Sequence, residues 1–251
     1  MEKIQILGVP IDNVDMKEAV KRAPDAIEAH RKYFIVTPNS EIVVEANNNE
    51  ELLNIIKDAD LVVPDGIGLV IGSKIIGKPL SERVTGIDLM EQLLIYANKN
   101  FKSVYLIGGK EGIAFDAGIN IKRKYPNIKI AGTHHGYFSG IHTGKPGHSE
   151  EEEVIEHIIN ADADMVFVAL GALKQERFIN TYIHRLSGRL FMGVGGSLDV
   201  YSGTVKRAPA IYQKLGIEWL YRLIKEPFRI QRMMSLPVFL INVLIKKEKP
   251  M

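Results

Sequence analysis

Short runs of apolar, often β-branched residues alternate with longer amphipathic stretches along the first 205 residues of this 251-residue chain. The apolar runs have the composition of strands buried on both faces, and the amphipathic stretches repeat their apolar residues at helical spacing. A helix between two strands carries the chain back, so that the strands run parallel. The sequence therefore predicts an α/β fold: a mostly parallel, Rossmann-like sheet with helices on both faces.

The predicted elements follow one another in regular order. Strands are expected at 4–9, 33–36, 61–63, 104–107, 128–131, 165–170 and 190–194. The clearest helices are expected at 16–30, 87–98 (opened by Thr85), 113–125, 151–160 and 175–186. We expect residues 1–205 to form the α/β core and residues 206–251 to form a basic, amphipathic C-terminal helical appendage.

The ligand crevice of a parallel sheet lies at the carboxyl ends of its strands, so the residues after each apolar run are candidates for a site. Five runs end in such residues: Thr37-Pro38-Asn39, Pro64-Asp65-Gly66, Gly108-Gly109, Gly171 and Gly195-Gly196. Glycine lets backbone N–H groups approach a phosphate closely, and a following helix N-terminus favours an anion. Three glycine turns at one edge would suit a diphosphate, although glycine also ends many strands that bind nothing.

Asp65 lies in the stretch L-V-V-P-D-G-I-G-L-V, between a buried strand and the next helix. A carboxylate there can act as a general base on a ligand in the crevice. It can equally cap the helix that starts near Ile67. The residues alone leave both explanations open.

Two other groups of polar residues contain side chains that can bind metals, but their positions and spacing do not support a metal site. Pairs of Asp at 58 and 60 and at 162 and 164 have the D-x-D spacing that can hold a divalent cation. Each pair precedes its strand and so falls at the amino edge, where we interpret the acids as solvated turn residues. His134, His135, His142 and His148 fit no ligand spacing, and the segment 139–149 is expected to be a flexible, lid-like loop. No metal site is predicted.

Composition and charge narrow the function classes. The chain has no cysteine, which excludes disulfides and thiolate metal sites, and its N-terminus lacks the features of a signal peptide, so we expect a cytoplasmic protein. The net charge of the chain is +2. Residues 206–251 contain ten Lys or Arg and three Glu, a net charge of +7, so residues 1–205 carry a net charge of −5. A basic tail on an acidic body suggests an anionic partner.

Seven short motifs, in order along the whole chain, resemble those of the bacterial WecG/TagA/CpsF glycosyltransferases. They are T-P-N (37–39), P-D-G-I-G (64–68), E-R-V-T-G (82–86), Y-L-I-G-G (105–109), G-A-L-K-Q-E (171–176), G-V-G-G-S-L-D (193–199) and R-A-P (207–209). The resemblance implies an inverting enzyme that needs no metal or cofactor and acts in wall teichoic acid linkage-unit synthesis. Its implied reaction transfers N-acetylmannosamine from UDP to the 4-hydroxyl of N-acetylglucosamine on undecaprenyl diphosphate.

The resemblance also assigns roles to residues and partners. Asp65 matches the family's proposed base, and Thr37 and Asn39 match positions that line the pocket, where they would bond sugar hydroxyls. The implied partners are a UDP-sugar donor, the lipid-linked acceptor and the cytoplasmic membrane surface. Nucleic acid is not expected, and self-association is left open.

Three further side chains are matched to contacts with the donor. Arg83 and Gln175 match positions that engage the diphosphate or the donor sugar, and Asp199 matches a position near the uracil. The glycine turns complete the expected substrate-binding set with Gly108, Gly109, Gly195 and Gly196.

The tail contributes a predicted phosphate clamp. Arg222, Arg229 and Arg232 would share one face of a continuous helix, and the resemblance implies that the appendage folds over the pocket and completes it. The apolar segment 233–245 is too short to span a membrane, which requires about 20 residues. We expect it to lie at the membrane interface, and the alternative is a helix that packs on its own domain or on a second subunit.

Two other functions are considered. Gly66-Ile67-Gly68 begins a dinucleotide-binding pattern whose third glycine is missing, so a Rossmann-type oxidoreductase is the alternative enzyme. A non-enzymatic membrane adaptor would explain the tail alone.

Overall fold

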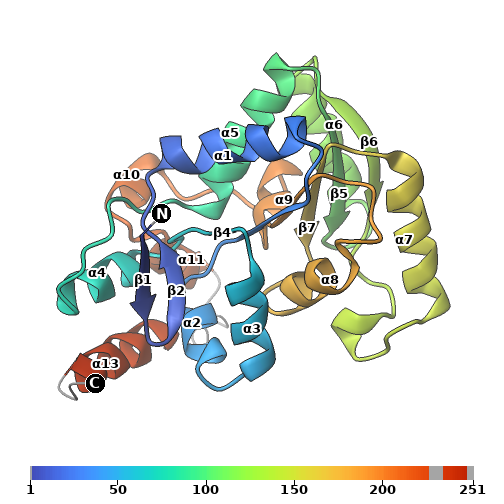
Figure 1. Ribbon diagram of the computed structural model, residues 1–251. Coiled ribbons are helices and arrows are strands. Elements are labelled where there is room, and N and C mark those ends of the chain that lie inside the picture. Colours follow the sequence, from blue (N-terminus) through green and yellow to red (C-terminus); the bar gives the residue numbers. More distant parts are fainter. Residues whose placement is uncertain (1, 226–233, 248–251) are drawn as a thin grey trace.

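The computed structural model describes residues 2–225 and 234–247 and is built around a six-stranded sheet in which every pairing is parallel. The strands lie in the order β4-β3-β8-β7-β5-β6 (Figure 1). Their bounds are Tyr33–Val36 (β3), Leu61–Val62 (β4), Ser103–Gly108 (β5), Lys129–His134 (β6), Met165–Ala169 (β7) and Leu190–Gly193 (β8). The predicted mostly parallel α/β sheet is confirmed.

Helices cover both faces of the sheet, which explains why the central strands read as unbroken apolar runs. Every residue of β3, β5 and β8 is buried. One apolar cluster joins the sheet to the helices α1 (Met16–Glu28), α5 (Gly86–Lys99) and α6 (Ile113–Lys124). The other joins it to α2 (Ser40–Ala46), α3 (Glu50–Asp58), α7 (Ser149–Ala161) and α8 (Lys174–Tyr182).

Local capping signals set where several helices begin. Thr85 caps α5 as predicted, and its Oγ1 accepts a hydrogen bond from the Asp88 N–H at 3.3 Å. Asp15 and Glu18 form a capping box at the start of α1. Asn39 and Asn49 cap α2 and α3, two helices that were absent from the sequence prediction. Both are short, so their helical periodicity is weak.

The first apolar run differs from the prediction. A single strand over 4–9 is wrong, because the run is divided into β1 (Lys3–Ile6) and β2 (Val9–Asp12), which pair as an antiparallel hairpin outside the main sheet. Leu7 and Gly8 form the turn with φ of 53° and 87°. Two consecutive residues with positive φ make the tight turn that joins antiparallel strands.

The segment 139–149, predicted as a flexible loop, is tied to the body. It contains a short 3₁₀ turn, η1 (Ile141–Thr143), and it folds around the buried carboxylate of Glu151. That carboxylate accepts hydrogen bonds from the Ile141 N–H at 2.6 Å and the Gly147 N–H at 3.0 Å. Tyr182 adds a third, at 2.7 Å from its hydroxyl. The loop therefore has an anchor that its glycine-rich sequence does not reveal.

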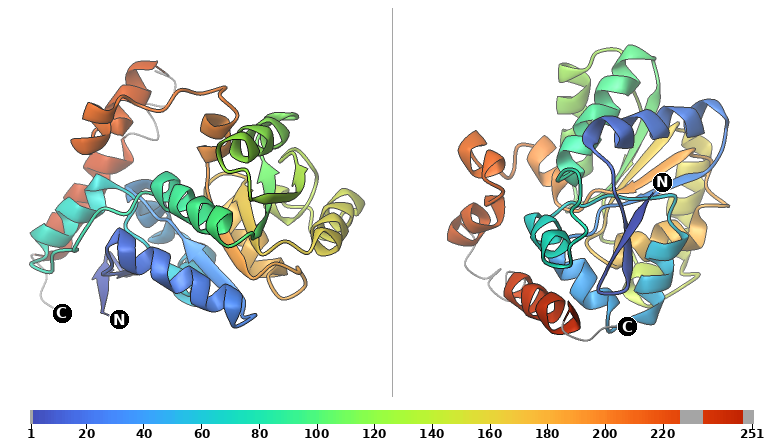
Figure 2. Two further views of the ribbon diagram at one scale, coloured as in Figure 1. Left: turned by 90° about the horizontal axis from the view of Figure 1, so that it is seen from above. Right: turned by 60° about the vertical axis from the view of Figure 1, so that its left-hand side comes forward.

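The helices of the C-terminal part lie along one flank of the body, beside α4 (Ile67–Ile75) (Figure 2). They are α10 (Ala210–Lys214), α11 (Glu218–Lys225) and α13 (Ser235–Lys247). α13 packs against α2 and α4 and buries Phe239 and Val243 in the main core. A Cβ on Gly72 of α4 would lie only 2.8 Å from the Phe239 ring. The absence of that Cβ lets the two helices meet closely.

Replacing Phe239 by alanine tests whether α13 belongs to the cooperative core. Because the ring is fully buried, Phe239→Ala is expected to lower the free energy of unfolding by about 3 kcal/mol. Phe115→Ala is the matched control, since this ring on α6 is 60% exposed; it should change the free energy by less than about 0.5 kcal/mol. Chemical denaturation measures both. Equal small changes would mean that α13 unfolds independently of the body.

Candidate active site

The connections of the sheet place a crevice at the carboxyl ends of β5 and β7. The chain leaves β5 through α6 toward β6 and leaves β7 through α8 toward β8, so these neighbouring strands are extended in opposite directions. Such a switch point opens the sheet edge to ligands. The turns there contain the predicted glycines, with φ of 131° at Gly108 and 72° at Gly109. A Cβ on Gly108 would lie 2.3 Å from the Ala169 carbonyl oxygen, so only glycine fits.

A hollow of about 340 Å³ lies beside these turns. Lys110 and Glu111 follow β5, and His135 and Tyr137 follow β6, so the hollow lies at the same edge. These four residues were not among the predicted site residues.

Asp65 follows β4 at the same edge and does not cap its own helix. Gly66 is the N-cap of α4, and no side chain caps that helix. The half-buried Asp65 carboxylate instead accepts a hydrogen bond from the N–H of Gly86, the first residue of α5, at 3.1 Å. Its own N–H donates to the Pro38 carbonyl at 3.1 Å. The capping explanation is thus wrong for α4, and the acid joins the loops after β3 and β4 to the start of α5.

Thr37 and Asn39 lie beside Asp65. Thr37 is buried, donates from Oγ1 to the Gly193 carbonyl at 3.4 Å, and lies 3.2 Å from where a Cβ on Gly86 would be. A Cβ on Gly66 would lie 3.2 Å from the Cβ of Asn39. The Asn39 side-chain oxygen accepts from the Ile42 N–H at 3.1 Å as the cap of α2. Both predicted pocket residues therefore belong to the same corner as the acid.

Gln175 connects this corner to the turn after β8. Its side-chain oxygen accepts a hydrogen bond from the Gly195 N–H at 3.1 Å, and its side-chain nitrogen donates to Glu176 at 2.8 Å. Gln175 is only 3% exposed, and a Cβ on Gly193 would lie 2.5 Å from its side-chain nitrogen. Gln175 thus shapes the Gly195 turn in this structure. Its direct contact with the donor stays a prediction.

Glu176 is a residue of this site that the sequence analysis missed. Its side chain is 1% exposed, and its Oε2 has no hydrogen-bond partner among the described residues. Burial raises the pKa of the Glu176 carboxyl above its ordinary value, and the bond from Gln175 offsets part of that effect. The only available signal was an acid directly after Gln175 in the G-A-L-K-Q-E motif.

Arg83 lies on the segment that returns from α4 to α5, and its partners are in the appendage. Its Nη2 donates to the Gln213 carbonyl at 2.9 Å and lies 3.6 Å from Glu218 Oε1. The next residue, Val84, donates its N–H to the Pro64 carbonyl at 3.0 Å. Arg83 is therefore close along the chain to the Asp65 corner, while its predicted contact with the diphosphate stays untested.

Asp199 belongs to the short helix α9 (Ser197–Tyr201), which the body holds firmly. Tyr201 donates from its hydroxyl to Glu91 of α5 at 2.5 Å, and Asn120 of α6 donates to the Tyr201 carbonyl at 3.0 Å. Before α9, Gly195 has φ of 49° and Gly196 is exposed. This turn and helix place Asp199 just beyond the carboxyl end of β8.

Comparison with known proteins identifies the family. The model of the glycosyl transferase WecG/TagA/CpsF family matches residues 4–251. The chain belongs to this family. Proteins of Staphylococcus aureus strains MRSA252, MW2 and NCTC 8325 are each 37% identical over 249 residues, which cover 98% of this chain and 94% of theirs. Each is named N-acetylglucosaminyldiphosphoundecaprenol N-acetyl-beta-D-mannosaminyltransferase. The protein is therefore a glycosyltransferase.

The structure brings together some of the predicted site residues of this glycosyltransferase and separates others. Asp65, Thr37, Asn39, Gln175 and Gly195 form one connected corner. The glycine turn after β5 lies further along the same edge. The backbone of Arg222 lies in α11, whereas Arg229 and Arg232 fall outside the described residues.

The D-x-D acids, which the sequence analysis interpreted as turn residues, lie at the amino edge of the sheet of the glycosyltransferase. Asp60 accepts from the Phe34 N–H at 2.8 Å, and Asp164 accepts from the Ser103 N–H at 2.7 Å, so both brace strand starts as turn residues. Within 2–225 and 234–247, no three His, Asp or Glu side chains cluster as metal ligands.

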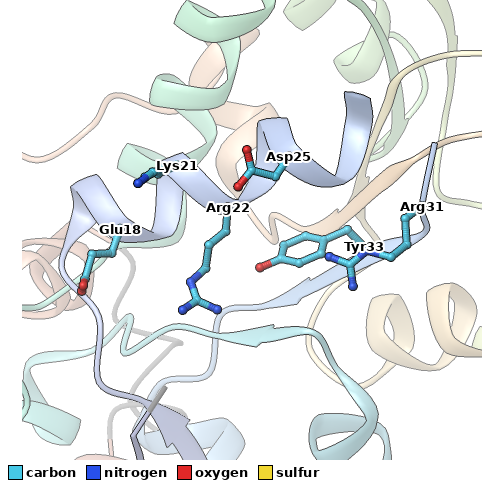
Figure 3. Close-up of a pocket in the computed structure, with 6 residues that line it drawn as sticks. All are labelled: Glu18, Lys21, Arg22, Asp25, Arg31 and Tyr33. Atoms are coloured by element: carbon cyan, nitrogen blue, oxygen red, sulfur yellow. The ribbon is translucent and has the colours of Figure 1, made fainter. Parts of the chain in front are cut away.

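A hollow of about 440 Å³ also lies at this edge (Figure 3). It is bounded by α1 and the start of β3, with Arg22 and Tyr33 among its lining residues. No predicted site residue lines it.

The incomplete dinucleotide pattern has a structural role in the glycosyltransferase. Gly68 of α4 is buried beside α2 and α13, and a Cβ there would lie 2.0 Å from Ser40 Oγ and 2.7 Å from Leu236. Its glycine is required for helix packing. Nothing in this arrangement favours the oxidoreductase alternative.

The raised pKa of Glu176 predicts a pH-dependent stability. The ordinary pKa of a Glu carboxyl is 4.5, and below that pH both the folded and the unfolded state hold the Glu176 proton. Above pH 4.5 the unfolded state loses the proton first. The free energy of unfolding therefore falls until the pH passes the pKa of Glu176 in the folded state. Glu176→Gln should remove this loss and make the protein more stable than wild type at pH 7, by a margin that shrinks toward pH 4.5. Thermal unfolding between these pH values measures it.

Glu153→Gln, an exposed acid on α7, is the control for Glu176→Gln and should follow the wild-type profile. A Glu176→Gln profile parallel to wild type at every pH would contradict the assignment.

Proposed function

We propose that this glycosyltransferase transfers N-acetylmannosamine from UDP-N-acetylmannosamine to the 4-hydroxyl of N-acetylglucosamine on undecaprenyl diphosphate, in wall teichoic acid linkage-unit synthesis. The observation that carries the proposal is the name shared by relatives that match 98% of the chain. The position of Asp65 supports it, because a half-buried acid at the carboxyl edge of the sheet is where this reaction needs a base.

The proposed reaction is a single displacement with inversion at the anomeric carbon. Asp65 takes the proton from the acceptor 4-hydroxyl as that oxygen bonds to C1 of the donor sugar. The bond between C1 and the phosphate oxygen breaks, and UDP leaves with the electron pair. The hydrogen bond from the Gly86 N–H holds the acid in place, so little reorganisation is required when the acceptor arrives.

The leaving diphosphate must be stabilised as its charge develops. The glycine turns after β5 and β8 let the backbone approach the diphosphate closely at the sheet edge, and arginines of the appendage would add positive charge. We assign this role to Arg222, Arg229 and Arg232, with Asp199 accepting from the uracil ring. These charges would take the place of a metal ion, and the D-x-D acids at the far edge are not needed.

The lipid acceptor requires contact with the cytoplasmic membrane surface. Among the helices within 2–225 and 234–247, none has the length and apolar character to cross a bilayer. The C-terminal helices nevertheless present apolar side chains that are 42–64% exposed: Ile211, Leu215, Ile224, Met234, Val238, Ile241, Leu244 and Ile245. α13 thus has one face in the core and another facing outward. We propose that the outward face lies at the membrane interface, next to Lys246 and Lys247.

A donor panel tests the proposed reaction. Purified protein is incubated with lipid diphosphate-linked N-acetylglucosamine and UDP-sugars carrying N-acetylmannosamine, its uronic acid or glucose, in buffer that contains EDTA. Mass analysis should detect one added N-acetylhexosamine with the first donor, and added Mg²⁺ should leave the rate unchanged. Transfer of another sugar would replace the proposed donor, and protection from thermal unfolding by NAD but not by UDP would overturn the transferase assignment.

Asp65→Asn tests the proposed base. The amide keeps the size of the side chain and an acceptor oxygen for the Gly86 N–H but cannot take a proton, so turnover should fall by about 10²–10⁴. UDP should still protect the variant from thermal unfolding. Asp58→Asn, an exposed acid at the end of α3, is the matched control and should keep wild-type turnover. Full activity of Asp65→Asn would exclude it as the base.

A further inference from the structure

The start of the appendage docks on the Asp65 corner through a row of alternating charges. Asp88 of α5 lies 2.6 Å from the Arg207 guanidinium, measured from Oδ1 to Nη2. The Nε of Arg207 lies 3.9 Å from Glu218 Oε2, and the other oxygen of Glu218 lies 3.6 Å from Arg83. The Glu218 side chain is only 13% exposed, whereas its partners and Asp88 are 20–39% exposed, so dissolved ions reach part of the row and screen it.

This row of charges links the appendage to residues that flank the proposed base. Asp88 is in the first turn of α5, whose first residue, Gly86, donates its N–H to Asp65. Arg83 precedes Val84, which bonds to the Pro64 carbonyl. Both ends of the row therefore rest on segments that hold the Asp65 loop in place.

Packing contacts are also made at this interface. Gly216, in a left-handed conformation with φ of 71°, is buried against Ile67, and a Cβ there would lie 3.1 Å from the Ile67 side chain. Ile67 begins α4, two residues after Asp65. Tyr212 and Tyr221 have ring centroids 5.3 Å apart and join α10 to α11. The two short helices thus meet the body as a unit.

α11 depends on this docking for its own stability. It has eight residues, and a helix of that length is marginal in water without tertiary contacts. Glu218 is its first residue, and Arg222 follows one turn later. Whatever fixes Glu218 therefore fixes the backbone at Arg222.

We propose that Glu218, held between Arg83 and Arg207, is a positioning residue that latches the appendage helix α11 beside Asp65. The latch fixes the backbone at Arg222, a member of the proposed phosphate clamp, and this consequence for turnover rests on the proposed function. Because the latch consists of ion contacts without a covalent link, its strength falls as ionic strength rises. The docking itself does not depend on which sugar is transferred.

Hydrogen exchange of the full-length protein, without substrate, tests the latch directly. Glu218→Gln removes the charge and keeps the shape, so amides of residues 218–225 should exchange about ten- to a hundredfold faster than in wild type. In wild type, raising the salt from about 0.05 to 1 M should speed the same amides, whereas Glu218→Gln should respond less to salt, because only the Asp88–Arg207 contact of the row remains. If apolar packing alone held α11, exchange in wild type and in Glu218→Gln would respond to salt equally.

Two further variants make the result specific. Glu152→Gln breaks a different acid–arginine pair, 2.6 Å from Arg185 on the far side of the body, and should leave exchange in α11 unchanged. Arg207→Gln should speed exchange, and the effect of the double variant with Glu218→Gln should be smaller than the sum of the two single effects, because both remove the Arg207–Glu218 contact. Additive effects would mean that the two residues act separately, which would overturn the latch.

The activity assay separates the latch from the proposed function. Glu218→Gln should lower the rate of sugar transfer by about tenfold with Asp65 intact. If wild type transfers no sugar but α11 responds as described, the proposed function fails and the latch stands. Unchanged exchange in Glu218→Gln overturns the latch, and so does faster transfer, because the carboxylate would then be blocking an anion site.

Discussion

Parallel pairing of all six strands is the constraint on which the rest of this structure depends. A parallel strand cannot follow its neighbour through a tight turn, so each connection crosses the sheet and the carboxyl ends collect at one edge. Asp65, Thr37 and Gln175 are far apart in the sequence, yet they meet there through bonds that pass by way of Gly86, Gly193 and Gly195. Most of these links involve the backbone, which leaves the site little freedom to rearrange.

Missing side chains matter as much as those present in this corner. Gly66 leaves room for Asn39, Gly86 for Thr37 and Gly193 for Gln175, with hypothetical Cβ contacts of 2.5–3.2 Å. The structure also shows whether Asp65, in the L-V-V-P-D-G stretch, caps a helix. Asp65 does hold the start of a helix, but the helix is α5, which arrives from the other side of the loop. A carboxylate bound in this way has a fixed position just beyond the carboxyl end of β4.

The C-terminal part is joined to the body by two kinds of interaction. α13 inserts Phe239 and Val243 into the apolar core, whereas α10 and α11 meet the body through Arg83, Arg207 and Glu218. Salt weakens the charged contact by screening, whereas it does not screen the apolar one. Different parts of one appendage can therefore respond differently to a charged surface, which suits a protein whose proposed acceptor is a lipid.

The sequence by itself determined the class of fold, the strand ends at which the candidate site residues lie and the amino-edge position of the D-x-D acids. These features follow from hydrophobic periodicity and capping, which are local properties of the chain. Only the tertiary structure decided that residues 4–9 form part of a hairpin, that Asp65 bonds to Gly86, that Glu176 is buried beside Gln175 and that Arg83 faces Glu218. Each of these depends on which distant segments become neighbours. A side chain's partner is set by the packing of whole elements, and no pattern within a single segment records it.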